Sequence, residues 1–89
     1  MAELQVELVA ADRMVWEGTA TMVSARGVEG DLGVMAGHTP LMTILADGEV
    51  RINGAGSTQT AHVSGGFMTV DSDRVVIVAE TVETATPQR

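Results

Sequence analysis

The segment from Gly30 to Pro40 constrains the fold of this 89-residue chain more than any other stretch. It contains three glycines, one histidine and one proline within eleven residues. Glycine adopts backbone conformations that a Cβ atom forbids, while Pro40 fixes its own φ angle and favours an extended conformation at Thr39. We therefore expect two tight bends around one short strand, residues 32–35, followed by a strand that begins at Leu41.

The remainder of the chain reads as short strands separated by turns. Apolar and polar residues alternate in residues 4–8 and again in residues 49–53, which is typical of half-buried strands. Asp47-Gly48 predicts a hairpin turn. Gly65 and Gly66 are expected to bend the chain before Phe67.

Residues 75–79 are apolar throughout, which predicts a central strand covered on both faces. In the whole chain, eight to ten short strands separated by turns are expected, and no window shows the apolar period of a helix. The fold class is therefore all-β, as a two-sheet sandwich or a barrel. We expect one domain over residues 1–82 and a polar tail over residues 83–89.

Composition excludes several classes of partner and site. Twelve acidic residues against five arginines give a net charge of −7, so nucleic acid and anionic membrane surfaces are poor partners. The absence of cysteine excludes disulfides and thiolate metal sites. The longest apolar run is far shorter than a membrane span, so no direct membrane insertion is expected and the features suit a soluble cytoplasmic protein.

Few residues suggest chemistry. Glu29 and Asp31 lie on one predicted bend, where most acidic pairs are simply solvated, and no nucleophile stands at a meaningful spacing. His38 and His62 are the only histidines and lack a third ligand, so no metal site and no cofactor are expected. The five methionines after Met1 lie in or beside predicted strands, where we expect most of them to fill the core and one or two to face a partner.

Four segments, in order, carry a resemblance to a known family. They are residues 29–33 (Glu-Gly-Asp-Leu-Gly), 37–41 (Gly-His-Thr-Pro-Leu), 47–48 (Asp-Gly) and 64–67 (Ser-Gly-Gly-Phe). From about Leu4 to about Thr81 the chain resembles the epsilon subunit of bacterial F-type ATP synthases. The resemblance implies a flattened sandwich of two antiparallel sheets in the central stalk, packed against the gamma subunit and resting on the rotor ring of c subunits.

The resemblance also implies a role and a set of contacts. The chain is expected to be a non-catalytic coupling subunit at the cytoplasmic face of the bacterial cell membrane, within the ATP synthase complex. The residues implied in contacts with gamma are Ala10, His38, Met42 and Thr43, and those implied in contacts with the ring are Glu29 and Asp31. Members of the family usually continue into two inhibitory C-terminal helices; because this sequence stops at Arg89, we expect that brake to be missing.

Two other functions are compatible with a small β domain. One is a free-standing β-sandwich module that binds a ligand, although only two aromatic residues occur in the chain and such sites usually expose several. The other is a small hydrolase that uses His38 or His62 with Ser24, Ser64 or Asp31, for which the spacing gives no nucleophile–base–orienter arrangement.

Overall fold

The computed structural model describes residues 3–54 and 57–84, and its regular structure consists of strands. The strands are β1 (Leu4–Ala10), β2 (Arg13–Ala20), β3 (Met22–Gly27), β4 (Gly30–Met35), β5 (Leu41–Leu45), β6 (Gly48–Gly54), β7 (Ser57–Asp71) and β8 (Arg74–Thr84). Within the described ranges there is no helix that could cross a membrane. The all-β prediction is confirmed.

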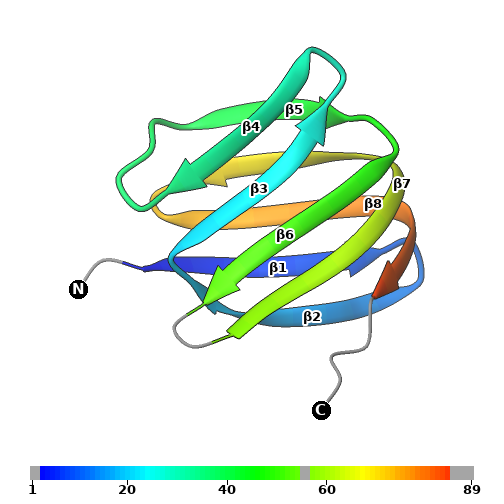
Figure 1. The fold of residues 1–89 in the computed structure, drawn as a ribbon, viewed down its shortest axis with the longest axis horizontal. Coiled ribbons are helices and arrows are strands. Elements are labelled where there is room, and N and C mark those ends of the chain that lie inside the picture. Colours follow the sequence, from blue (N-terminus) through cyan, green and yellow to red (C-terminus); the bar gives the residue numbers. More distant parts are fainter. Residues whose placement is uncertain (1–2, 55–56, 85–89) are drawn as a thin grey trace.

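The strands form two packed layers, seen crossing one another in Figure 1. Layer A contains β2, β1, β8, the second half of β7, and β5, in that order. Layer B contains β4, β3, β6 and the first half of β7. The molecule measures 33 × 31 × 22 Å along its principal axes, so the predicted flattened sandwich is confirmed.

Strand β7 belongs to both layers because it bends at two glycines. Gly65 and Gly66 have φ angles of +61° and +155°, a region in which side chains with a Cβ are strained. A Cβ at Gly66 would overlap the carbonyl oxygen of Val78 and lie 2.7 Å from the Cα of Ala79. The predicted bend before Phe67 is therefore present, and Gly66 also permits close approach of β7 and β8.

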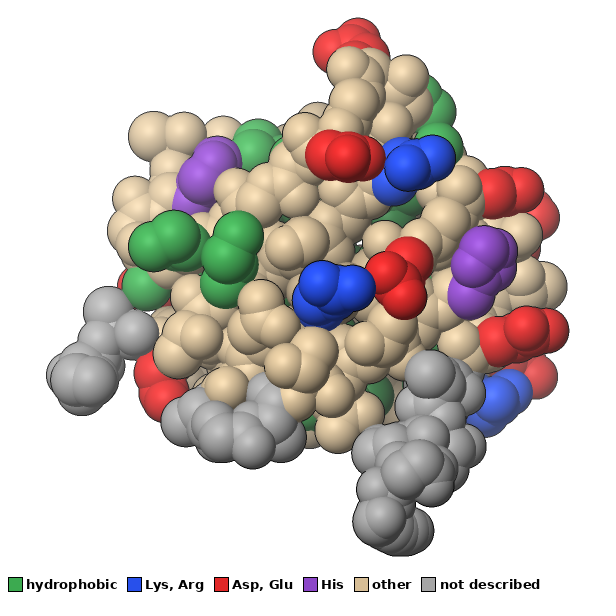
Figure 2. All heavy atoms as spheres, in the orientation of Figure 1, with side chains coloured by type: hydrophobic (Ala, Val, Ile, Leu, Met, Phe, Trp, Pro, Cys, Tyr) green, Lys and Arg blue, Asp and Glu red, His purple; other side chains and the backbone are tan. Residues whose placement is uncertain are grey.

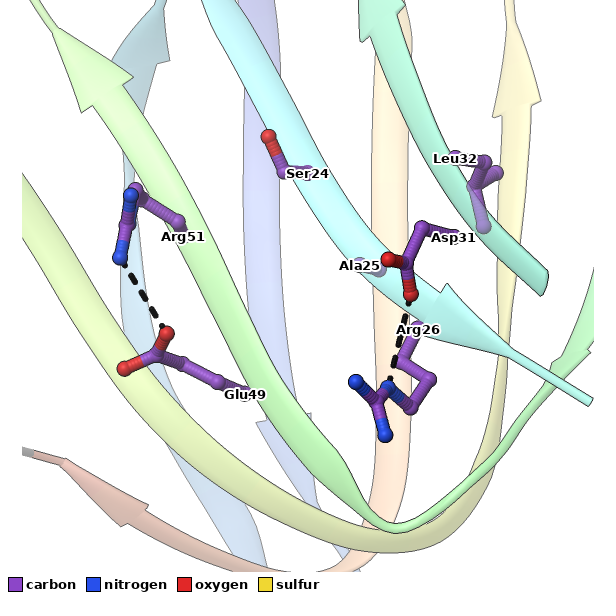
Figure 3. A pocket seen from close by; sticks show the side chains of 7 residues that line it. All are labelled: Ser24, Ala25, Arg26, Asp31, Leu32, Glu49 and Arg51. Carbon is purple, nitrogen blue, oxygen red and sulfur yellow. Dashed lines mark hydrogen bonds and ion pairs between the residues drawn. The ribbon is translucent and has the colours of Figure 1, made fainter.

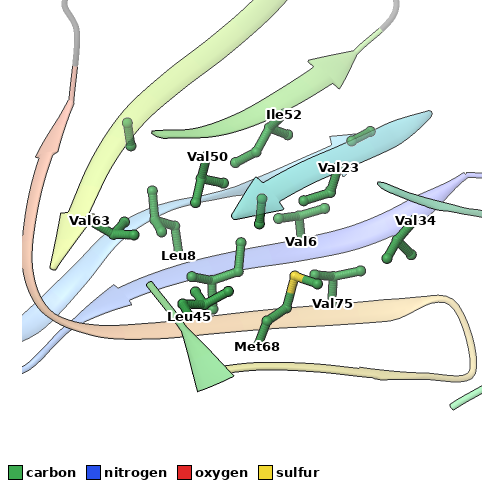
Figure 4. Packing of buried hydrophobic residues seen from close by; sticks show 14 of the residues in the cluster. Val6, Leu8, Val23, Val34, Leu45, Val50, Ile52, Val63, Met68 and Val75 are labelled. Carbon is green, nitrogen blue, oxygen red and sulfur yellow. The ribbon is translucent and has the colours of Figure 1, made fainter. Parts of the chain in front are cut away.

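The core lies between the layers and is built from the inward side of each alternating strand (Figure 4). Leu4, Val6 and Leu8 are buried, as the alternation in β1 predicts, and so are Val50 and Ile52 in β6. Across the described residues, no charged or polar side chain is buried. Burial of apolar surface is therefore the main source of stability in this domain.

Two sequence expectations about strand pairing are wrong. The sandwich is not wholly antiparallel, because β1 and β8 run parallel, with Val6 opposite Val75 and Leu8 opposite Ile77. Asp47-Gly48 does not close a hairpin either. It joins β5 in layer A, which pairs with β7, to β6 in layer B, which pairs with β3 and β7. The turn thus carries the chain between layers.

For residues 75–79, the prediction of a central strand is confirmed, and the prediction that both faces are covered is wrong. It is central in layer A, between β1 and β7, and Val75, Ile77 and Ala79 are buried. Val76 and Val78 point outward and are only half-buried, so the described chain covers β8 fully on one face. The strand extends to Thr84, and residues 85–89 of the predicted tail lie outside the described residues.

Candidate functional site

The outer face of layer A carries a continuous row of apolar side chains across its strands. The register places Ile44 beside Phe67, Phe67 beside Val78, Val78 beside Val9 and Val9 beside Met14, and the backbone N–H of Val28 donates to the carbonyl of Ile44 at 3.0 Å. We call these six residues the apolar stripe. Val28, Ile44 and Met14 are 61%, 51% and 47% exposed, and the other three are half-buried.

The stripe is bordered by a second apolar pair and by acidic groups. Met42, 67% exposed, and the half-buried Val76 lie in the next row of the same face. Glu7, Glu17 and Glu80 also point outward from this layer, and the carboxylate of Glu7 accepts a hydrogen bond from the guanidinium of Arg74 at 3.1 Å. A surface of this kind suits a macromolecular partner that presents an apolar face with a basic rim.

Met42 and Thr43, both predicted to contact a partner, lie on opposite faces of β5. Met42 points outward beside the stripe. Thr43 is half-buried and paired with the core residue Met68, and its hydroxyl oxygen lies 3.4 Å from the position that a Cβ would take at Gly27. Neighbouring residues of a strand alternate between faces, so only Met42 adds its side chain to the outer surface.

His38 and Ala10 mark opposite ends of layer A. The His38 ring places Nδ1 2.7 Å from the carbonyl of Thr39, in the loop that enters β5 at Leu41. Ala10 is only 5% exposed and ends β1, opposite Ala79. The distance from Leu4, the start of β1 at the His38 end, to Ala10 is about 20 Å at the usual rise of a strand.

The acidic bend lies at the Ala10 end of the molecule. Glu29 is exposed in the turn between β3 and β4. Asp31 is also exposed, and its carboxylate lies 3.4 Å from the Nε of Arg26. Because Val28 belongs to the same turn, one end of the apolar stripe is directly adjacent to this acidic bend.

The outer face of layer B differs in character from that of layer A. Figure 2 looks onto this face and shows basic and acidic side chains next to one another near its middle. An open pocket of about 270 Å³ lies there, and Figure 3 shows its charged lining. Arg26 pairs with Asp31, and Arg51 with Glu49 at 3.3 Å, so the charges of the pocket balance within the chain.

The candidate hydrolase residues are not assembled into a site. Ser24 and Asp31 line the pocket on layer B, but neither histidine does. His62 lies on β7 opposite Glu49 and Glu83, whereas His38 lies in the loop before β5. In the described part of the chain, no group of three His, Asp or Glu side chains is arranged to hold a metal ion.

Sequence reasoning did not identify the apolar stripe as a surface. The strand at residues 41–45 and the strand at residues 75–79 each carry apolar residues on both faces, and for residues 75–79 that pattern predicts burial on both sides. The signal was present in the residues of β5 and β8. The residue pattern alone does not show whether another layer of the same chain covers the outer face of these strands.

Comparison with known proteins identifies closely similar sequences. Residues 3–85 match the family described as the ATP synthase delta/epsilon chain, beta-sandwich domain. The chain is 52% identical over 80 residues to the ATP synthase epsilon chain of Micrococcus luteus, covering 89% of this chain and 88% of that protein. It is also 52% identical over 85 residues to the epsilon chain of Streptomyces griseus, covering 94% of this chain and 68% of that one.

Solved structures with the same fold come from rotary complexes. A chain of the Euglena gracilis mitochondrial ATP synthase, in a structure of OSCP, F1 and c-ring, superposes with a TM-score of 0.88 at 25% identity. The match covers 94% of this chain and 54% of that one, so this chain spans about half the length of its structural relative. A chain of the Tetrahymena thermophila central stalk and c-ring gives 0.75 at 14% identity, covers 89% of this chain and 64% of that one, and shows the shared fold alone.

Proposed function

This chain belongs to the ATP synthase delta/epsilon chain family, and we propose that it serves as a non-catalytic subunit of the central stalk that couples the rotor ring to the gamma subunit. The observation that carries the proposal is the apolar stripe on layer A. An exposed apolar row across five strands is unfavourable in water, and it becomes favourable when a partner covers it.

The stripe is the surface that we assign to gamma. Met42 and Val76 extend it, and its acidic border suits basic groups on the partner. We also assign a contact with gamma to His38, which lies in the loop before β5, at the end of layer A opposite Ala10. Thr43 and Ala10 are less exposed, so we assign them contacts that depend on backbone and strand position more than on their side chains.

The bend that holds Glu29 and Asp31 is the surface that we assign to the ring. It is adjacent to the stripe through Val28, so one rigid corner of the sandwich would meet both partners. Exposed ion pairs contribute only about 0.2–1 kcal/mol each, so these carboxylates would set the orientation on the ring more than the affinity.

Coupling by this chain requires no bond-breaking step. A sandwich with a close-packed core transmits force between two attached partners because it deforms little under load. We place the subunit at the cytoplasmic face of the membrane that holds the ring. Its task there is to turn with gamma and the ring as one body.

Charge substitutions on the two outer faces test the assignment to gamma. Ile44→Asp places a charge in the stripe, and Met35→Asp places one at a similarly exposed apolar residue on layer B, where Met35 is 58% exposed. Co-elution with the gamma subunit of the same organism should be lost for Ile44→Asp and retained for Met35→Asp. Equal binding by both variants would refute the assignment of this face.

A double variant tests the assignment to the ring. Glu29→Lys combined with Asp31→Lys should leave binding to gamma unchanged, because both carboxylates lie beyond the stripe. The same variant should reduce retention of the gamma–epsilon pair on membranes that contain the ring. Loss of gamma binding, or full retention on those membranes, would contradict the proposed division of the two surfaces.

A further inference from the structure

Strand β5 carries two of the most exposed apolar side chains of the partner surface, yet the sheet supports the first half of this strand on one side only. Met42 and Ile44 point outward from it. Over its whole length β5 pairs with β7. On its other side it is held only at its C-terminal end, where Leu45 is opposite Gly27, the backbone N–H of Val28 donates to the carbonyl of Ile44, and that of Ala46 donates to the carbonyl of Arg26. A five-residue strand with one full ladder is expected to fray unless something else fixes its ends.

A carboxylate fixes each end of this strand to a distant segment. Before β5, the backbone N–H of Gly37 donates to the side chain of Asp73, in the turn between β7 and β8, at 2.7 Å. After β5, the side chain of Asp47 accepts from the backbone N–H of Gly65, at the bend of β7, at 3.2 Å. The two bonds join segments 36 and 18 residues apart.

The turn that holds Asp73 is itself anchored. The backbone carbonyl of Asp73 accepts a hydrogen bond from the N–H of Gln5 at 2.8 Å, so the turn is fixed to the start of β1. Asp73 has a φ angle of +63°, a conformation that aspartate tolerates better than most residues, and its Oδ1 accepts from the loop before β5. The loop before β5 is therefore attached to the most buried strands of layer A through one side chain.

We propose that Asp73 and Asp47 are positioning residues that hold β5 in its binding geometry, so that Met42 and Ile44 are presented to the partner without a cost of ordering the strand. This inference rests on the proposed function, in that the partner is the gamma subunit. Hydrogen bonds to ionised carboxylates are stronger than neutral ones, and rigid presentation raises affinity by reducing the entropy lost on binding.

Matched substitutions separate the hydrogen bond from other effects of each aspartate. Asp73→Gly removes the acceptor and still permits the positive φ angle, whereas Asp73→Asn keeps both an acceptor oxygen and that conformation. Asp47→Ala and Asp47→Asn form the second pair. Asp12→Ala is the charge control, since Asp12 is exposed in the turn between β1 and β2 and pairs with its sequence neighbour Arg13.

The first measurement is amide hydrogen exchange in the full chain without partner. In the Asp73→Gly and Asp47→Ala variants, the backbone amide hydrogens of residues 37–46 should exchange with solvent about two- to tenfold faster than in the wild type. This is the range expected for one lost hydrogen bond. Amides of β1 should not change, whereas a general loss of stability would accelerate both. The Asn variants and Asp12→Ala should exchange like the wild type. Unchanged exchange in β5, or equal acceleration in β1, would overturn the inference.

The second measurement is affinity for the gamma subunit of the same organism. Asp73→Gly and Asp47→Ala should each bind about two- to tenfold more weakly, and the Asn variants should recover most of the loss. If the wild type binds and these variants bind equally well, the positioning role is refuted and the proposed function stands. If the folded wild type does not bind gamma, the proposed function is refuted, and the exchange data still decide whether the two carboxylates hold β5.

Discussion

Replacing Gly66 by alanine should be among the most destabilising single-methyl changes in this domain. The added Cβ would overlap the carbonyl oxygen of Val78 and approach the Cα of Ala79, and both are backbone atoms of the central strand β8. A non-glycine residue at a φ angle of +155° costs about 1–3 kcal/mol. If β8 shifts enough to lose one or two ladder hydrogen bonds, each contributes about 0.5–1.5 kcal/mol more. The total is about 1.5–6 kcal/mol.

That loss is a large part of the stability available to the chain. Small domains have about 0.05–0.15 kcal/mol per residue, which for 89 residues is roughly 4–13 kcal/mol. Equilibrium unfolding in urea, followed by Trp16 fluorescence and circular dichroism, would measure the difference by linear extrapolation. The variant should show a much lower midpoint with a similar slope.

Gly30→Ala is the matched control for this prediction. Gly30 has a φ angle of +135°, yet no atom lies within 4 Å of the position that its Cβ would take. The free energy of unfolding of Gly30→Ala should therefore fall only by the cost of the backbone conformation, about 1–3 kcal/mol. If Gly66→Ala is no more destabilising than Gly30→Ala, close packing of β7 on β8 is not what requires glycine at the bend, and our reasoning about the crossing between layers is refuted.

Three other predictions use the same unfolding measurement. Met68→Ala should lose about 2–5 kcal/mol because Met68 is fully buried, whereas Met42→Ala should change stability by less than about 0.5 kcal/mol; similar losses would contradict the assignment of inner and outer faces. Arg74→Gln should lose about 0.2–1 kcal/mol at low salt and less at 1 M salt, and an effect independent of salt would exclude the pair with Glu7 as the cause. His62→Ala should leave stability within about 0.5 kcal/mol, since its side chain is exposed on layer B; a larger loss would show a role for His62 that its position does not explain.

Local pattern predicted individual strands well. The alternation in β1 and β6 placed Leu4, Val6, Leu8, Val50 and Ile52 in the core, because the side-chain period of a strand can be read directly from neighbouring residues. The bend of β7 was also predictable, since two adjacent glycines have a known conformational effect. Such features depend on a few consecutive residues, and tertiary context did not override them.

Long-range pairing was not predictable in the same way. Nothing in the residues of β1 indicates that it lies parallel to β8, about seventy positions along the chain. Asp47-Gly48 has the chemistry of a hairpin turn, but turn chemistry does not determine which layer the next strand joins. The candidate site could be predicted only in part for a similar reason. In the sequence, an apolar residue that faces a partner cannot be distinguished from one that faces the core. Resemblance to the family supplied Met42, and only the register revealed Ile44, Phe67 and Val78 beside it.

Calorimetric titration of the full chain into the gamma subunit of the same organism, at several temperatures, tests the central claim most directly. We predict binding of one chain to one gamma subunit with a negative heat-capacity change, because apolar surface on the stripe is removed from water. Ile44→Asp should abolish that binding while the variant remains folded. A folded wild-type chain that gives no binding heat and no co-elution with gamma, or an Ile44→Asp variant that binds as tightly as the wild type, would contradict this account of the subunit.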